Sequence, residues 1–157
     1  DKVILPGVGN AAEAMANLQA RGLCSLVRSL RRPVLGICVG MQLMCRDSEE
    51  GPTQCLGIFD AHVRRFLETP GAKVPHMGWN SLANLGSKLF RDIPASPYVY
   101  FVHSYYAEVV PETAGFTEYA GVKFTAMVKK GRLWACQFHP EKSGRIGLEL
   151  LKEWLSC

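Results

Sequence analysis

Short apolar runs alternate with helical patterns in the first third of the chain. Val3–Leu5 and Val34–Ile37 are the kind of run that forms a buried strand, and a glycine-bearing turn follows each. Between them, residues 11–21 and 23–30 carry apolar side chains at helical spacing. The strand–helix–helix–strand order predicts parallel strands joined by a helical crossover, and therefore an α/β layered fold.

The middle and the end of the chain favour strands over helices. Residues 59–66 alternate between apolar and polar side chains, and residues 98–109 are rich in aromatic and β-branched side chains. Residues 124–128 and 133–138 flank the sequence Lys-Lys-Gly-Arg, which is typical of a β-hairpin. We therefore expect strands at all four places and a hairpin formed by the last two.

A closing amphipathic helix is predicted over residues 144–155, whereas residues 69–74 and 111–114 are predicted to be loops. The sequence shows no internal repeat, low-complexity tract or linker. We expect a single domain over residues 1–157, long enough for a sizeable core. A hydrophobic content of 48% and a charged content of 20% are ordinary for a globular protein.

Charge and cysteine content exclude several classes of function. The net charge of +4 is spread over isolated basic pairs, so no nucleic-acid surface is indicated. The six cysteines have no metal-ligand spacing, and we expect neither a metal site nor a cofactor. No signal peptide and no apolar stretch of membrane-spanning length is present, which favours a cytoplasmic location.

Cys38 is the first candidate for chemistry, because it follows an apolar strand and opens a helix predicted over residues 39–46. Gly36 and Gly40 flank it, which allows the sharp strand-to-helix turn of a nucleophile elbow. A helix N-terminus favours a thiolate through its partial positive charge. The alternative is a tight turn that holds a buried structural thiol.

The second candidate is the run His139-Pro140-Glu141. In an extended segment, side chains two positions apart share a face, so Glu141 could orient His139 and stabilise its charged form. The alternative is a chance spacing in a loop. Cys38, His139 and Glu141 together have the three parts of an activated-thiol site.

Two segments resemble the class I (triad) glutamine amidotransferases. Gly36–Gln42 resembles their nucleophile segment and Phe138–Glu141 their base segment. Leu5–Gly9, Pro75–Asn80 and Tyr100–Tyr105 narrow the resemblance to the glutaminase subunits of imidazole glycerol phosphate synthase. The resemblance runs from residue 1 to the C-terminus.

The resemblance implies a flavodoxin-like layered fold with a central, mostly parallel sheet and an added antiparallel section. Members of the family have a strand, a helix and a second strand before the first strand of this chain. We therefore expect the chain to lack that N-terminal segment. In the implied chemistry, Cys38 is the nucleophile, His139 the base and acid, and Glu141 the orienting carboxylate.

Donors for the developing oxyanion are expected on two segments. The residue after the nucleophile, Val39, would donate its backbone N–H at the helix N-terminus. The resemblance implies a second donor from Gly7, Val8 and Gly9, where glycine allows a peptide flip that could switch activity on when the partner is occupied. The alternative for this segment is an ordinary strand-to-helix turn.

The resemblance also implies two residues that hold the substrate. Gln42 lies one helical turn after the nucleophile, on the same face. Glu50 matches an acidic residue that contacts the amino-acid end of glutamine, although a one-residue shift would select Glu49 instead. The alternatives are a surface residue of the helix for Gln42 and a solvated charge for Glu50.

A partner interface is implied for a further group of residues. Their alternative role is structural packing, because a tryptophan in such a segment is more often part of a core than of a contact. The candidates are Trp79, Asn80, Tyr100, His103 and Lys142.

The function implied by the resemblance is hydrolysis of L-glutamine, with delivery of ammonia to a separate (β/α)8 cyclase subunit in a heterodimer. The chain is too short for a second catalytic domain, so the acceptor chemistry would lie on that partner. Two alternatives stay open. One is a Cys-His hydrolase of the related α/β peptidase or chaperone type, and the other is an inactive, truncated interaction module.

Overall fold

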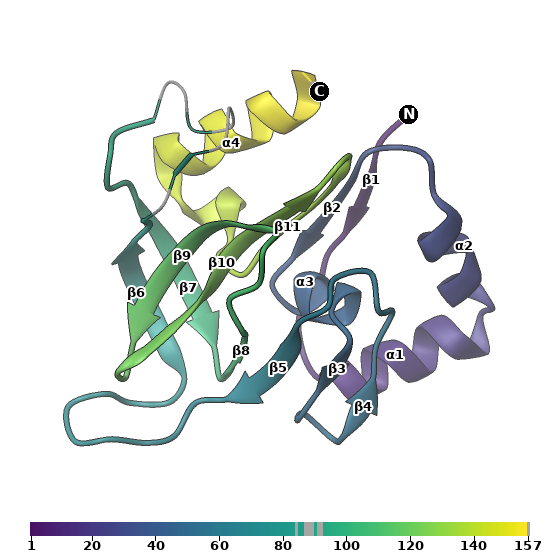
Figure 1. Ribbon diagram of the computed structural model, residues 1–157, viewed down its shortest axis with the longest axis horizontal. Helices are drawn as coiled ribbons and strands as arrows, with labels where there is room; N and C mark the ends of the chain where they lie inside the picture. The colour runs from purple at the N-terminus through teal and green to yellow at the C-terminus, as the bar shows by residue number, and fades with distance from the viewer. Residues whose placement is uncertain (84, 87–89, 91–92, 157) are drawn as a thin grey trace.

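The computed structural model describes residues 1–157 except residues 84, 87–89, 91–92 and 157 (Figure 1). The elements in chain order are β1 (Val3–Leu5), α1 (Ala11–Ala20), α2 (Leu23–Ser29), β2 (Val34–Ile37), α3 (Val39–Met44), β3 (Asp47–Ser48), β4 (Thr53–Gln54), β5 (His62–Arg65), β6 (His76–Ser81), β7 (Tyr98–His103), β8 (Tyr105–Ala107), β9 (Thr113–Tyr119), β10 (Val122–Lys130), β11 (Leu133–Cys136), the 3₁₀ turn η2 (Pro140–Lys142) and α4 (Gly144–Ser156).

The larger sheet is mixed, in the order β1-β2-β11-β10-β8-β5-β3-β4, with β9 paired to β10. Parallel pairing joins β1 to β2, β2 to β11, and β3 to β5, and the remaining pairs are antiparallel. The α/β prediction is confirmed. Parallel pairing at the β1 end is confirmed as well, and so is the added antiparallel section, in which hairpins replace helical crossovers and make the sheet as a whole mixed.

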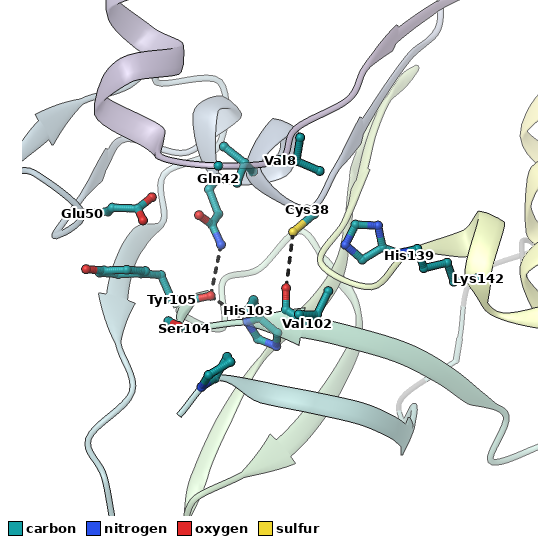
Figure 2. Close-up of a pocket in the computed structure, with 13 residues that line it drawn as sticks. Val8, Cys38, Gln42, Glu50, Val102, His103, Ser104, Tyr105, His139 and Lys142 are labelled. Carbon is teal, nitrogen blue, oxygen red and sulfur yellow. Dashed lines mark hydrogen bonds between the residues drawn. The ribbon is translucent and has the colours of Figure 1, made fainter. Parts of the chain in front are cut away.

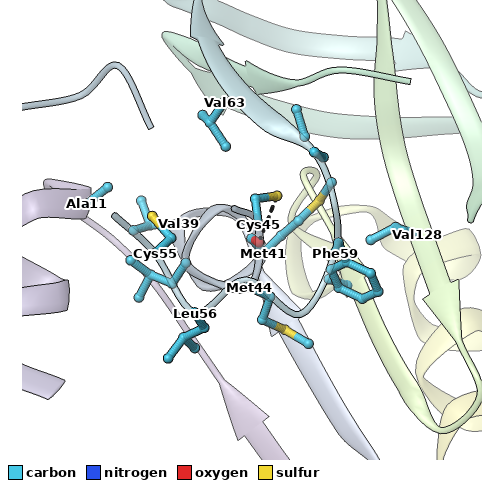
Figure 3. Close-up of a cluster of buried hydrophobic side chains, with 14 of the residues drawn as sticks. Ala11, Val39, Met41, Met44, Cys45, Cys55, Leu56, Phe59, Val63 and Val128 are labelled. Carbon is cyan, nitrogen blue, oxygen red and sulfur yellow. Dashed lines mark hydrogen bonds between the residues drawn. The ribbon is translucent and has the colours of Figure 1, made fainter. Parts of the chain in front are cut away.

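Two hydrophobic cores lie on opposite faces of this sheet, because adjacent strand residues point to opposite sides. Val34 packs with α1 and α3, whereas its neighbour Leu35 packs with Trp154 of α4 and with Phe101 of β7. Strands β6 and β7 pair antiparallel in a smaller, two-stranded sheet, called here the β6–β7 ribbon. Figure 1 shows α1 and α2 on one side of β1 and β2, with α4 away from them near this ribbon. The cluster around α3, which includes Met41 and Phe59, is drawn in Figure 3.

Local predictions agree closely with the elements at the β1 end. β1 and β2 have the predicted bounds, and the hairpin of β10 and β11 forms at the predicted turn. α3 ends at Met44, two residues earlier than predicted. The pattern missed β3, β4, β6 and β9. β9 begins at Thr113, inside a segment predicted to be a loop.

Candidate active site

Cys38 lies in a strained turn between β2 and α3, with φ 54° and ψ −112°. A Cβ atom on Gly36 would lie 2.7 Å from the Met44 sulfur, and one on Gly40 would overlap the Leu5 carbonyl oxygen. Both flanking positions therefore require glycine for close packing. The predicted elbow is present in the geometry of the backbone.

The Cys38 thiol is 5% exposed, and burial raises its pKa to about 11. Two hydrogen-bond donors oppose the effect of burial and lower this pKa: the backbone N–H of Val39 and the side chain of Gln137. Gln137 Nε2 lies 3.6 Å from the sulfur. The thiol itself donates to the carbonyl of Val102 at 3.9 Å (Figure 2). The effect of burial on the pKa of Cys38 thus outweighs the expected preference of the helix N-terminus for a thiolate.

His139 is held at its backbone and at its ring. Its Nδ1 lies 2.7 Å from Oε1 of Glu141, whose side chain is 52% exposed. The His139 N–H donates to the Tyr100 carbonyl at 2.9 Å, and the hydroxyl of Ser143 donates to the His139 carbonyl at 2.6 Å. The Tyr100 N–H donates to that same hydroxyl at 3.0 Å, which closes a ring of three hydrogen bonds. Strand β7 therefore fixes the backbone of His139.

Gln42 and Gln137 form a buried pair beneath the thiol. Gln42 Nε2 donates to the Tyr105 carbonyl at 3.1 Å and to Gln137 Oε1 at 3.0 Å. Gln42 and Gln137 are 2% and 0% exposed. The two amides join α3, the end of β11 and the start of β8 into one polar network.

Glu50 and Glu49 point to different places. Glu50 Oε2 accepts from the backbone N–H of Ala11 at 2.7 Å, at the start of α1. Glu49 instead pairs with Arg64 at 3.1 Å and accepts from the N–H of Arg65. Of the two carboxylates considered in the sequence, Glu50 is the one that lines the pocket described next.

A cavity of about 370 Å³ brings most of the predicted site residues together (Figure 2). The predicted residues that line it are Val8, Gly9, Cys38, Val39, Gln42, Glu50, His103, His139 and Lys142. Gly7 lies behind the pocket wall, where an added Cβ would come within 2.6 Å of the Val39 Cβ. The segment with Gly7 to Gly9 therefore packs directly against the elbow.

Two buried histidines form a polar chain behind the pocket. The Nδ1 of His103 donates to the Tyr105 carbonyl at 2.7 Å, and its Nε2 lies 3.0 Å from Nδ1 of His76. Asn80 donates to His76 Nε2 at 3.3 Å and to the Glu118 carbonyl. Burial lowers the pKa of His103 to about 3 and that of His76 to about 4. Both rings are therefore neutral, and His103 belongs to the pocket wall rather than to the exposed surface.

An exposed aromatic surface lies on the β6–β7 ribbon. Trp79 is 57% exposed, and its ring centroid lies 6.0 Å from that of Tyr100 in an edge arrangement. Lys142 Nζ lies 6.0 Å from the Tyr100 ring centroid. Met77 and Tyr98 are also exposed. Exposed large apolar side chains gathered on one ribbon are typical of an interaction site.

The sequence analysis missed four residues that contact the proposed catalytic groups: Val102, Tyr105, Gln137 and Ser143. Two of them act through backbone carbonyls, which no side-chain pattern reveals. Gln137 directly precedes the base segment Phe138–Glu141, and its polar side chain at the end of an otherwise apolar run was the available signal.

Among the residues that the structure describes, no group of three histidine, cysteine or acidic side chains could hold a metal ion. In the same part of the chain, none of the helices has the length and apolar character needed to cross a membrane.

Comparison with known proteins gives consistent matches across the chain. The family model described as "Glutamine amidotransferase class-I" matches residues 1–155. The chain is 51% identical over 156 residues to the "Imidazole glycerol phosphate synthase subunit HisH" of Bacteroides thetaiotaomicron, covering 99% of this chain and 79% of that protein. It is 47% identical over 157 residues to the subunit of the same name from Yersinia pseudotuberculosis, with the same coverage.

Solved structures share the fold at lower identity. A crystal structure of a glutamine amidotransferase superimposes with a TM-score of 0.67 at 18% identity, covering 99% of this chain and 77% of that one. A glutamine amidotransferase from Thermotoga maritima gives a TM-score of 0.62 at 20% identity, covering 98% and 61%. At such identities the likeness concerns the fold alone.

Proposed function

The chain belongs to the class I glutamine amidotransferase family, and from this premise we propose that it hydrolyses L-glutamine through Cys38, His139 and Glu141. We further propose that it delivers the ammonia to a separate cyclase subunit. The relatives named as HisH subunits of imidazole glycerol phosphate synthase support a role in histidine biosynthesis. The observation that carries the chemistry is the Cys38 elbow opening into the same cavity as the Glu141-bonded His139.

In the proposed reaction, His139 takes the proton of the Cys38 thiol as the sulfur attacks the side-chain amide carbon of glutamine. Because Nδ1 of His139 is bonded to Glu141, Nε2 is the ring nitrogen that serves the thiol. His139 then returns the proton to the leaving nitrogen, so ammonia departs and a γ-glutamyl thioester remains on Cys38. Water, deprotonated by His139, hydrolyses the thioester to glutamate.

The negative oxygen formed during attack requires hydrogen-bond donors. We assign one to the Val39 N–H, which already interacts with the Cys38 sulfur. Gly7, Val8 and Gly9 are assigned the second, because their segment packs against the elbow and Gly9 has a φ of 94° that suits glycine. The alternative of an ordinary turn predicts no effect on rate when this segment is altered.

Recognition of glutamine is assigned to Gln42 and Glu50. The carboxylate of Glu50 lines the cavity and can attract the α-ammonium group of an amino acid. Gln42 lines the cavity between Glu50 and Cys38 (Figure 2). An amide and a carboxylate placed around the thiol favour glutaminase over the alternative of a peptide hydrolase.

The cyclase is proposed to dock on the β6–β7 ribbon, beside the mouth of the cavity. Trp79, Tyr100 and Lys142 supply an exposed aromatic surface with a cation, a composition typical of interface anchors. Asn80 and His103 are proposed to support this ribbon from within, because both are engaged with His76.

The test is glutamate release from L-glutamine, measured with and without a cyclase barrel and its nucleotide ligand. We expect release to rise when the loaded cyclase is added and to vanish in Cys38→Ala, with folding retained. Turnover of glutamine by Cys38→Ala would refute the assignment of the nucleophile. Absence of glutamate under both conditions would favour the inactive-module alternative.

A further inference from the structure

The backbone carbonyl of Tyr105 fixes the orientation of both side-chain amides in the polar network of Gln42 and Gln137 beneath the thiol. The Tyr105 carbonyl only accepts, so the Gln42 atom 3.1 Å from it must be the amide nitrogen. That same nitrogen lies 3.0 Å from Gln137, so the Gln137 atom facing it must be the oxygen. The Gln137 nitrogen therefore faces Cys38 Sγ, at 3.6 Å. The orientation of both amides follows from one backbone group.

This direction decides what the pocket offers to a ligand. The two hydrogens of the Gln42 amide are used by Tyr105 and Gln137, so the Gln42 atom that remains for a ligand is the acceptor Oε1. Figure 2 shows that oxygen on the side that faces Glu50. An acceptor on that side suits the α-ammonium group of an amino acid, which has N–H groups to donate and which we have assigned to the neighbouring Glu50.

The same direction decides what the sulfur receives. Gln137 Nε2 can only donate to Cys38 Sγ, and a donated hydrogen bond stabilises a thiolate more than a thiol. The Val102 carbonyl acts in the opposite sense, because it accepts the thiol hydrogen. Gln137 is fully buried, so water does not compete for its side chain and its hydrogen bond to the sulfur is not weakened by solvent.

We propose that Gln137 is a positioning residue of this site, which holds the Gln42 oxygen toward the α-ammonium end of the substrate and aims an N–H donor at the Cys38 sulfur. The identity of the ligand rests on the proposed glutaminase function, but the contact with sulfur does not. Gln137 thereby links the binding of the substrate to the reactivity of the thiol.

The experiment uses Gln137→Met, which has nearly the same shape but neither donates nor accepts at this place. Thr125→Val is the matched control, because it removes another buried polar group that contacts Glu108 and Thr113 rather than the site. Alkylation of Cys38 by iodoacetamide is followed by peptide mass spectrometry from pH 6 to pH 9, with half-buried Cys24 as the internal reference. Protection of Cys38 by L-glutamine and by L-glutamate gives the two apparent binding constants.

We expect Gln137→Met to lower the Cys38 alkylation rate at a given pH by about tenfold, as befits one lost hydrogen bond to a charged group. Binding of glutamine and of glutamate should also weaken by about tenfold each, because the two share the α-ammonium group, while Cys24 and Thr125→Val stay at wild-type values. A folded Gln137→Met protein with an unchanged alkylation rate would overturn the assigned contact with sulfur. Unchanged binding of both ligands would overturn the assigned control of Gln42, whereas failure of glutamine to protect the wild type would refute the glutaminase proposal instead.

Discussion

Replacing Cys38 by glycine should give a more stable protein than replacing it by alanine, against the usual order. With φ 54° and ψ −112°, Cys38 has the backbone angles of the first central position of a type II′ turn, where glycine dominates. A non-glycine residue in such a sparsely populated region costs about 1–3 kcal/mol. Within a regular element, glycine is instead less stable than alanine by about 0.5–1 kcal/mol. The difference leaves Cys38→Gly more stable by about 1 kcal/mol.

The loss of the sulfur does not affect the difference in stability between the two variants, because both lack it. Both should also be inactive. Urea unfolding, followed by the fluorescence of buried Trp134 and Trp154, measures the free energy of unfolding of each. An increment of about 1 kcal/mol corresponds to a rise in Tm of about 2–4 °C for a chain of this size. Ala16→Gly, on the exposed side of α1, is the control and should destabilise by about 1 kcal/mol. Equal stability of the two Cys38 variants, with a normal control, would refute the idea that the elbow stores strain.

Three further results are expected. Ser143→Ala should lower kcat for glutamine by about tenfold with little change in KM, because the backbone of His139 loses a buried hydrogen bond. Ser143→Thr keeps the hydroxyl and should retain most of the wild-type kcat. Trp79→Ala should reduce activation by the cyclase in a titration while leaving the urea midpoint unchanged, since its side chain is exposed. The free energy of unfolding should fall as the pH drops from about 6.5 towards 4, because burial lowers the pKa of His76 and His103 and only the unfolded chain takes up these protons. In urea titrations at several pH values, His76→Gln should lessen this fall. An unchanged dependence of the free energy of unfolding on pH in that variant would contradict this account.

Local patterns predicted the parts of the fold in which sequence neighbours make the structure. The elbow around Cys38 follows from two glycines next to an apolar strand, and the β10–β11 hairpin follows from a Gly-bearing turn between β-forming runs. β6 escaped prediction because Gly78, with a φ of 126°, interrupts its pattern. The pairings of β6 with β7 and of β5 with β8 join strands that lie apart in the sequence, so no local turn specifies them, unlike the β10–β11 hairpin.

The candidate site likewise contains some residues that a local pattern predicts and others that depend on distant contacts. Cys38 and His139 could be predicted because each lies in a short segment whose residue types fit one chemistry. Gln137 and Ser143 could not be assigned, because their roles depend on contacts with residues far away in the sequence, such as Gln42 and Tyr100. A buried side chain that serves another side chain leaves no periodic signal.

Strand β7 and the residues just after it touch three of the residues assigned to the reaction, Cys38, His139 and Gln42, so the positions of these three are not independent. Tyr100 bonds to the backbone of His139, the Val102 carbonyl accepts from Cys38, and the Tyr105 carbonyl orients Gln42. The other edge of β7 pairs with β6, which carries the exposed Trp79. Ser143→Ala and Trp79→Ala therefore perturb β7 at one residue, Tyr100, which bonds to Ser143 on one edge and pairs with Trp79 on the other. Loss of cyclase activation in both variants would place the coupling route in β7, whereas loss in Trp79→Ala alone would point to the loop with Gly9 on the other wall of the cavity.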